Sequence, residues 1–395
     1  MPRRRSRYRF SYFYAVAVIS AVSAGYIFGL AELQAAFNPM YRASDLYSPR
    51  AIDVLIFLWC LWVGCSVGSF LNVVAYRMPR GESINGRSRC PRCWVQLKAR
   101  DNFPVLGWLA LGGRCRKCRL PISPRYPIVE TIVGLTLTSV AILELYQFNL
   151  PRQHIFSTRG PAWSPLVTGP VLLTLLYHIV GLSLSWAFGL IRMDGKCLPA
   201  KLVGFTAAAL TIPMLVYPRL MIVPWQMEVD ATWNPNGLVI DAIVRIMTAF
   251  AAATILARYL ARGLCPQADP KLDPLGKPTM RLMDLVAIMA VPIVIVGWQA
   301  APALAVLASL IAFLIRRFLP PSCDSLGSFA IAMPLALTFQ LALWRRLHAT
   351  HLDPSGGFSL WPSDNGSPWV VLFWSALLLI VPLWLSDRGE LETEA

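Results

Sequence analysis

Long apolar segments dominate this 395-residue sequence. A helix needs about 17 to 25 apolar residues to cross roughly 30 Å of hydrocarbon. Ten segments approach or reach that length, at about 13–30, 52–76, 127–145, 166–191, 202–216, 238–259, 282–298, 302–315, 326–343 and 369–385. The composition, 56% hydrophobic and 14% charged, exceeds what a soluble core needs. The sequence therefore predicts an all-α polytopic membrane protein of about ten spans, with the lipid bilayer as its surroundings.

The distribution of basic residues predicts an orientation. Cytoplasmic loops of membrane proteins carry an excess of Lys and Arg, and the N-terminal segment 3–7 reads Arg-Arg-Arg-Ser-Arg. With a cytoplasmic N-terminus, the loop 77–125 is also cytoplasmic, and it holds twelve basic residues against Glu82 and Asp101. The pair Arg345-Arg346 is an exception, because this topology places it outside. The net charge of +15 mostly reflects this asymmetry beside anionic headgroups, and we predict no nucleic-acid partner.

The same loop contains two CxxC pairs, Cys90/Cys93 and Cys115/Cys118, separated by 21 residues. Four thiolates at this spacing can close a tetrahedral site around one structural zinc ion. In a reducing cytoplasm, paired CxxC motifs favour metal binding over structural disulfides. The alternative is a redox pair, which normally needs one CxxC at a helix N-terminus that lowers a thiol pKa.

Further motifs surround the cysteines, in 68–84 (GSFLNVVAYRMPRGESI), 87–93, 101–109, 113–118, 121–123 and 125–130. Together they closely resemble the N-terminal part of the prepilin peptidases, and Glu130 matches a position of that family. The resemblance implies a multi-pass protein of the bacterial inner membrane with its zinc loop in the cytoplasm. Members of the family are aspartic proteases that cut the leader from prepilins or pseudopilins. Many also methylate the new N-terminus with S-adenosylmethionine, and the four-cysteine loop has been associated with that role.

The chemistry of such a protease requires two carboxylates that share a proton at one membrane face. The first family motif, Asp-x6-Pro, falls at Arg192 when it is counted back from Pro199. Arginine stays protonated and cannot act as a general base. Asp194 is the nearby carboxylate and our candidate for the first catalytic residue. Its alternative role is that of a solvated turn residue before Gly195.

The second family motif, Gly-x-Gly-Asp, ends at Asp284, with Arg281 and Met283 in place of the glycines. Asp284 is therefore our candidate for the second catalytic residue, although it could instead complement a helix N-terminus. The span count puts Asp194 and Asp284 at the same cytoplasmic face, so we predict that their carboxylates approach within a few ångströms or share one water. Arg192 or Arg281 beside either carboxylate would oppose a shared proton.

The family has eight spans, so the resemblance makes the first and tenth segments additions. We predict five parts: an extra N-terminal span and outer loop (1–50), a second span (51–76), the zinc loop (77–126), a peptidase-like core (127–345), and an outer loop with an extra span and an acidic tail (346–395).

The leading functional prediction is a membrane aspartic endopeptidase that acts on prepilin-type leaders, with N-methylation left open. The alternative is a catalytically degenerate relative that binds such leaders or scaffolds pilus or secretion assembly. A third hypothesis keeps methyl transfer without proteolysis.

Overall fold

The structure is a computed structural model of the chain. It describes residues 9–90, 92–149, 165, 167–222, 236–268, 271, 273–274, 276–347, 361–362 and 368–385. The basic segment 3–7 and the acidic tail 387–395, on which two of the predictions rest, lie outside the described residues.

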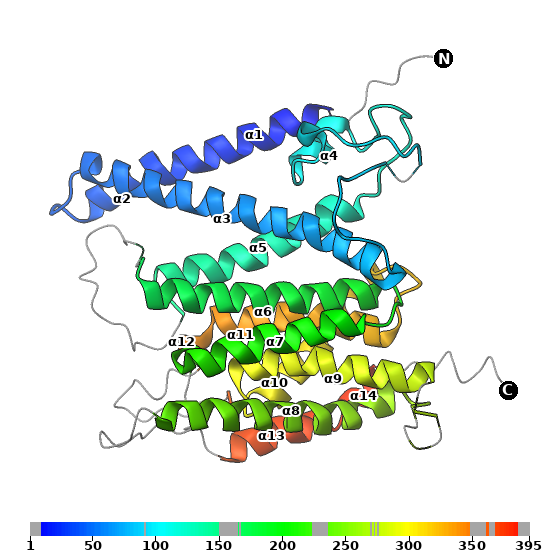
Figure 1. The fold of residues 1–395 in the computed structure, drawn as a ribbon. Coiled ribbons are helices and arrows are strands. Elements are labelled where there is room, and N and C mark those ends of the chain that lie inside the picture. The colour runs from blue at the N-terminus through cyan, green and yellow to red at the C-terminus, as the bar shows by residue number, and fades with distance from the viewer. Residues whose placement is uncertain are drawn as a thin grey trace. The chain divides into compact units, whose positions relative to one another are not determined.

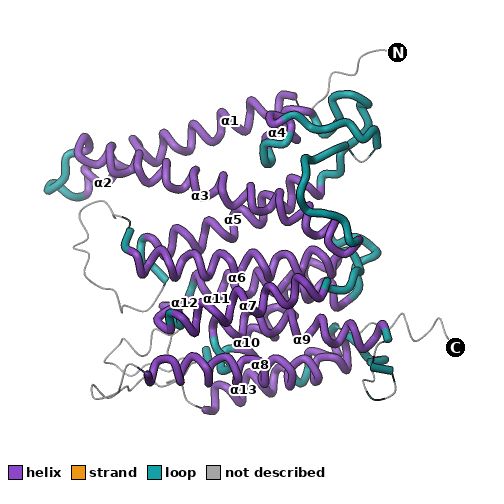
Figure 2. The backbone as a smooth tube through the Cα atoms, viewed as in Figure 1, coloured by secondary structure: helices purple, strands orange, loops and turns teal. Residues whose placement is uncertain are grey.

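The described residues are almost entirely helical, and no strand occurs among them (Figures 1 and 2). The α-helices are α1 (Arg9–Ala24), α2 (Leu30–Phe37), α3 (Ala43–Arg77), α4 (Leu106–Leu111), α5 (Arg125–Leu145), α6 (Gly169–Met193), α7 (Ala200–Val216), α8 (Asn236–Leu264), α9 (Lys277–Val296), α10 (Ala301–Ile315), α11 (Ser325–Ala342), α12 (Trp344–Leu347), α13 (Pro368–Leu378) and α14 (Val381–Trp384). A π-helical turn, Gly25–Gly29, joins α1 to α2. The predicted all-α class is confirmed.

Eight helices within the described part of the chain are long and apolar enough to cross a membrane. They match eight of the ten predicted segments, so the chain is a multi-pass membrane protein. The fifth segment forms α7, which at 17 residues is shorter than the others. The tenth is interrupted, because α13 stops at Leu378 and Pro382 opens the short α14. The Tyr259 hydroxyl donates to the carbonyl of Leu379 in the break at 3.0 Å, which satisfies an acceptor that helix termination leaves free.

The chain divides into two compact units, and the five-part division stays a prediction. The first unit comprises 1–74, 83–146 and 155–167, and the second comprises 75–82, 147–154 and 168–395. In the first unit, α3 and α5 pack closely through small residues. A Cβ added to Gly64 would lie 2.9 Å from the carbonyl oxygen of Gly134, and one added to Gly68 would lie 2.9 Å from the Cα of Glu130. These glycines bring the two backbones together.

The second unit is built on α6, α9 and α11, which carry most of its buried residues. A Cβ added to Gly189 of α6 would lie 2.8 Å from the carbonyl oxygen of Ala330, so α6 and α11 are in direct backbone contact. The C-terminal end of α6, the first turns of α9 and the N-terminus of α11 come together through polar side chains. This junction holds the residues that the aspartate motifs single out.

Candidate functional site

The four predicted zinc ligands meet in one cluster. The Sγ atoms of Cys90, Cys93, Cys115 and Cys118 all lie within 4.8 Å of one another. Two of the distances, Cys90 to Cys118 and Cys93 to Cys115, are 3.9 Å. A tetrahedron with Zn–S bonds of about 2.3 Å has S–S edges of about 3.8 Å. The cluster therefore has the ligand set and the spacing that a structural zinc ion requires.

The two CxxC turns have the same backbone geometry. In each, the first cysteine donates its N–H to the carbonyl five residues ahead and accepts from the N–H four residues ahead. The partners are Val95 and Trp94 for Cys90, and Leu120 and Arg119 for Cys115. Trp94 and Arg119 occupy equivalent positions with φ of 57° and 60°. The spacing in the sequence thus produces two matched turns that present their sulfurs to one point.

Two thiols of the cluster, Cys115 and Cys118, have pKa values that differ from that of a free cysteine. Backbone N–H groups of Cys118 and then Lys117 stabilise the Cys115 thiolate and lower its pKa to about 7. The N–H of Leu120 acts in the same direction on Cys118, but burial and the neighbouring thiols outweigh it and raise the Cys118 pKa to about 11. None of the four cysteines opens a helix among the described residues, so the predicted requirement for a redox pair is not met.

Two carboxylates hold the cysteine loop in place. The Arg116 guanidinium donates to both oxygens of Asp101, with Nε 3.0 Å from Oδ2, and this hydrogen bond lowers the pKa of Asp101. Glu130 in the first turns of α5 accepts the N–H of Val105 at 2.7 Å. Val105 has φ 58° and ψ −57°, a strained conformation for a β-branched residue. The Glu130 carboxylate therefore fixes the strained turn of the loop to a membrane helix.

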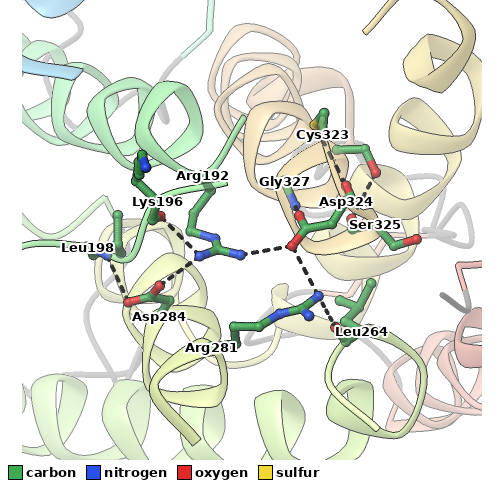
Figure 3. Close-up of polar contacts among 11 residues, drawn as sticks. Arg192, Lys196, Leu198, Leu264, Arg281, Asp284, Cys323, Asp324, Ser325 and Gly327 are labelled. Carbon is green, nitrogen blue, oxygen red and sulfur yellow. Dashed lines mark hydrogen bonds and ion pairs between the residues drawn. The ribbon is translucent and has the colours of Figure 1, made fainter. Parts of the chain in front are cut away.

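Arg192 occupies the centre of the other candidate site (Figure 3). It is 1% exposed, in the last turn of α6. Its Nη1 lies 3.3 Å from Oδ2 of Asp284 and donates to the carbonyl of Lys196 at 3.0 Å. The other oxygen of Asp284, Oδ1, accepts the N–H of Leu198 at 3.1 Å. Both oxygens of this buried carboxylate are thus engaged, one of them by Arg192, the residue that the count from Pro199 predicts at the first aspartate position.

A second acid, Asp324, completes the network. Arg192 Nη2 and Arg281 Nη2 each lie 3.0 Å from Asp324 Oδ2. The remaining oxygen of Asp324 accepts the N–H of Gly327, so Asp324 also caps the N-terminus of α11. Two arginines and two aspartates give the cluster a formal charge of zero. The arrangement can join α6, α9 and α11, and it keeps a guanidinium between the two carboxylates.

Asp194 ends α6 in a Schellman-type turn. Gly195, with φ 67°, donates to the carbonyl of Arg192 at 2.8 Å, and Lys196 donates to that of Ile191 at 3.3 Å. Asp194 is half-buried in this turn, which supports its alternative role as a turn residue. The hydrogen bonds described for Asp284 go to Arg192 and Leu198. The pairing of Asp194 with Asp284 stays a prediction.

Sequence reasoning missed Asp324. Its available signal was Asp-Ser-Leu-Gly at the start of an apolar segment, which is typical of a helix N-cap. That pattern predicts the bond to Gly327 but not the ion pairs with Arg192 and Arg281. The neighbouring Cys323 is not an activated nucleophile, because burial and then Asp324 raise its pKa to about 12.

Part of the chain is similar to a known protein domain. Residues 62–143 match the model of the Bacterial Peptidase A24 N-terminal domain. This segment contains the four cysteines, Asp101 and Glu130, and it ends before Arg192 and Asp284. No solved structure matches the chain significantly.

Several curated relatives carry the name prepilin leader peptidase/N-methyltransferase. The protein from Myxococcus xanthus is 56% identical over 81 residues, 20% of this chain and 24% of the relative. The protein from Klebsiella pneumoniae is 34% identical over 170 residues, 40% of this chain and 66% of the relative. The protein from Aeromonas salmonicida is 29% identical over 283 residues, 65% of this chain and 77% of the relative.

The alignments thus span between a quarter and two thirds of the length of the first two of these relatives. The matched domain and the named relatives agree with the motifs around the cysteines. The chain belongs to the prepilin peptidase family.

Proposed function

We propose that this chain binds the leader segments of prepilins or pseudopilins at the cytoplasmic face of the bacterial inner membrane without cleaving them. The observation that carries the proposal is the buried ion pair between Arg192 and Asp284, with Nη1 and Oδ2 3.3 Å apart. Arg192 stands where the family has its first aspartate, and its guanidinium takes up an oxygen of the aspartate that the chain retains.

The ion pair between Arg192 and Asp284 is unfavourable for aspartic proteolysis. One carboxylate must accept a proton from water while the other donates to the scissile carbonyl, so the pair shares one proton. Here Leu198 and Arg192 donate to the two oxygens of Asp284, and both contacts favour its ionised form over the protonated one. The positive charge of Arg192 also stabilises the ionised carboxylate of Asp284, which opposes a proton shared between two carboxylates.

The binding activity itself is inferred from the family. Relatives are named as prepilin leader peptidases, and this chain keeps the domain that they share. Zinc held by the four cysteines is the proposed structural cofactor, with the tetrahedral spacing as its support. The cytoplasmic orientation rests on the basic loops. Methyl transfer from S-adenosylmethionine enters the proposal through the names of the relatives alone.

A second candidate function is cleavage by Asp194 and Asp284. One observation favours it: the turn 192–198 contacts Asp284 at both of its ends, through the Arg192 side chain and the Leu198 N–H. Asp194 is carried in that turn. A rearrangement that withdrew Arg192 would leave two carboxylates at one junction, which is the minimum that the chemistry needs.

One experiment separates the two functions. The full chain and a pseudopilin from the same genome are expressed in cells that lack their own prepilin peptidase. We expect the pseudopilin to co-purify with the chain at full length, whereas an active family member, as positive control, shortens it. A shortened product with the wild-type chain that disappears in both Asp194→Asn and Asp284→Asn would establish cleavage and overturn the proposal. If the pseudopilin is neither bound nor cut, both functions fall.

A designed variant tests whether the aspartate motifs are the cause. Arg192→Asp combined with Arg281→Gly and Met283→Gly restores the first aspartate and both glycines. We expect cleavage to appear in this triple variant and not in the matched control Arg192→Asn with the same two glycines. Equal inactivity of the two variants would mean that features other than these motifs prevent cleavage.

A further inference from the structure

Trp94 combines backbone strain with exposure. It has φ 57°, in the left-handed region that glycine adopts most readily and that a bulky side chain disfavours. Nevertheless its side chain is 72% exposed, and its indole makes no described hydrogen bond or ring contact within the described part of the chain. A tryptophan here does not contribute to the core of the loop. The left-handed backbone belongs to the CxxC turn, because Arg119 shares it, whereas nothing in the packing of the loop accounts for an exposed indole there.

The surface around Trp94 is strongly basic. Between 83 and 124 the chain has nine Lys and Arg residues, all exposed, and a single acid. That acid, Asp101, is engaged by Arg116. The net charge of this segment is +8, and a zinc ion with four thiolates, which carries −2, would leave +6. At the equivalent turn, Arg119 takes the position that Trp94 takes in the first, and the exposed Leu120 follows it.

The covalent structure keeps this surface near the bilayer. The loop follows the span Ala43–Arg80 and precedes the span Arg125–Leu145. In addition, the carboxylate of Glu130, in the first turns of α5, accepts a hydrogen bond from the N–H of Val105 in the loop. The paired CxxC turns are therefore tied to the end of a membrane helix. Indole rings prefer the headgroup level of a membrane, and basic clusters beside spans are attracted to anionic lipids.

We propose that the paired CxxC turns form a membrane-docking surface, in which Trp94 inserts at the headgroup level and the exposed basic residues bind anionic lipid headgroups. This surface is separate from leader binding and does not depend on it. It would hold the cysteine loop against the bilayer, with the exposed Lys117 and Arg119 of the second turn contributing the attraction for phosphate.

The test uses the full chain in vesicles that contain phosphatidylglycerol or only zwitterionic lipid, with bromine-labelled acyl chains as quencher. The emission of Trp94 is the difference between wild type and Trp94→Phe. Trp59, 63% exposed on α3, gives the reference for a lipid-facing indole through Trp59→Phe. We expect bromine to reduce the Trp94 emission at least about twofold more in phosphatidylglycerol than in zwitterionic vesicles, and acrylamide in the water to quench it weakly.

Two further variants keep the outcome decisive. Trp94→Gly relieves the strained backbone, so we expect unchanged zinc content. Because it also removes the indole that inserts at the headgroup level, we expect faster trypsin cleavage of the loop in phosphatidylglycerol vesicles. Lys117→Glu with Arg119→Glu should abolish the difference between the two lipids. Strong acrylamide quenching without bromine quenching would overturn the proposal and favour a soluble acidic partner. Equal bromine quenching in both lipids would overturn the role of the basic residues.

Discussion

The cysteine loop and the Arg192 junction preserve their family motifs to different degrees. In the loop, all four cysteines are present and converge to within 4.8 Å. At the junction, Arg192 falls where the motif count from Pro199 predicts the first aspartate, and its ion-pair partner is Asp284. One region keeps the ligands for a metal ion, whereas the other contains its own counter-charge. A match to a family motif is thus informative about function only when the contacts of its residues are known.

The difference has a physical origin. Four thiolates close together repel one another unless a cation joins them, so the loop is suited to a metal from outside. The junction carries two arginines and two aspartates that neutralise each other, so it needs no ligand. The loop should therefore respond strongly to loss of zinc, and the junction to loss of its internal cation.

The largest effect is expected from loss of one zinc ligand. Cys90→Ser should reduce bound zinc from one ion per chain to nearly none, because structural zinc in small sites contributes about 10 to 16 kcal/mol and each ligand is needed. Metal analysis of the purified protein measures this. Cys197→Ser, at an exposed position outside the cluster, is the matched control and should keep its zinc. Unchanged zinc content in Cys90→Ser would mean that Cys90 is not a zinc ligand.

The next effect concerns the cation at the junction. Arg192→Met should destabilise the folded protein by about 3 to 5 kcal/mol, because it leaves the buried Asp284 carboxylate without its cation. The midpoint of unfolding in detergent measures this. Arg317→Met, at an exposed position, should change the stability by less than about 0.5 kcal/mol.

A double variant distinguishes an ion pair from simple packing. Arg192→Met combined with Asp284→Leu removes both charges, so its cost should be smaller than the sum of the two single costs by about 1 to 3 kcal/mol. Additive costs would mean that the two side chains act independently, and the charge-neutral account of the junction would then be wrong.

The sequence predicted the two regions unequally because their contacts differ in range. The four cysteines lie within one loop, so local spacing was sufficient to predict the cluster. Arg192 is 92 residues from Asp284 and 132 from Asp324, and no local pattern encodes those pairs. Hydropathy located the helices, but it could not predict the break before Pro382, where a turn interrupts an otherwise apolar segment. The turn at Asp194 was among the predicted alternatives, because Gly195 follows it directly, whereas its pairing with Asp284 stays a prediction.

A smaller effect is expected where α6 ends. Gly195→Ala should cost about 1 to 2 kcal/mol, because φ is 67° and a left-handed backbone disfavours alanine. A Cβ there would meet only the Ser322 carbonyl, at 3.6 Å, so the cost is conformational rather than steric. Gly204→Ala, in open space on α7, should instead be neutral or stabilise by up to about 1 kcal/mol. Thermal unfolding of both variants measures the difference, and equal effects would contradict the role of the turn.

The smallest effect concerns Asp101 in the loop. Asp101→Asn should weaken the loop by up to about 1 kcal/mol at pH 7, because Arg116, 49% exposed, is partly screened by water. Hydrogen bonding to Arg116 lowers the pKa of Asp101 below its ordinary value of 3.8. Its contribution is therefore complete above about pH 4 and is lost only as the pH falls through the lowered pKa of the folded state. The ratio of zinc-release rates between wild type and Asp101→Asn should stay constant from pH 7 to pH 5, since zinc release from protonated thiols accelerates in both proteins alike. A ratio that approaches one within that interval would mean that an acid other than Asp101 supports the loop. The stability of the loop would then not depend on the local contact between Asp101 and Arg116.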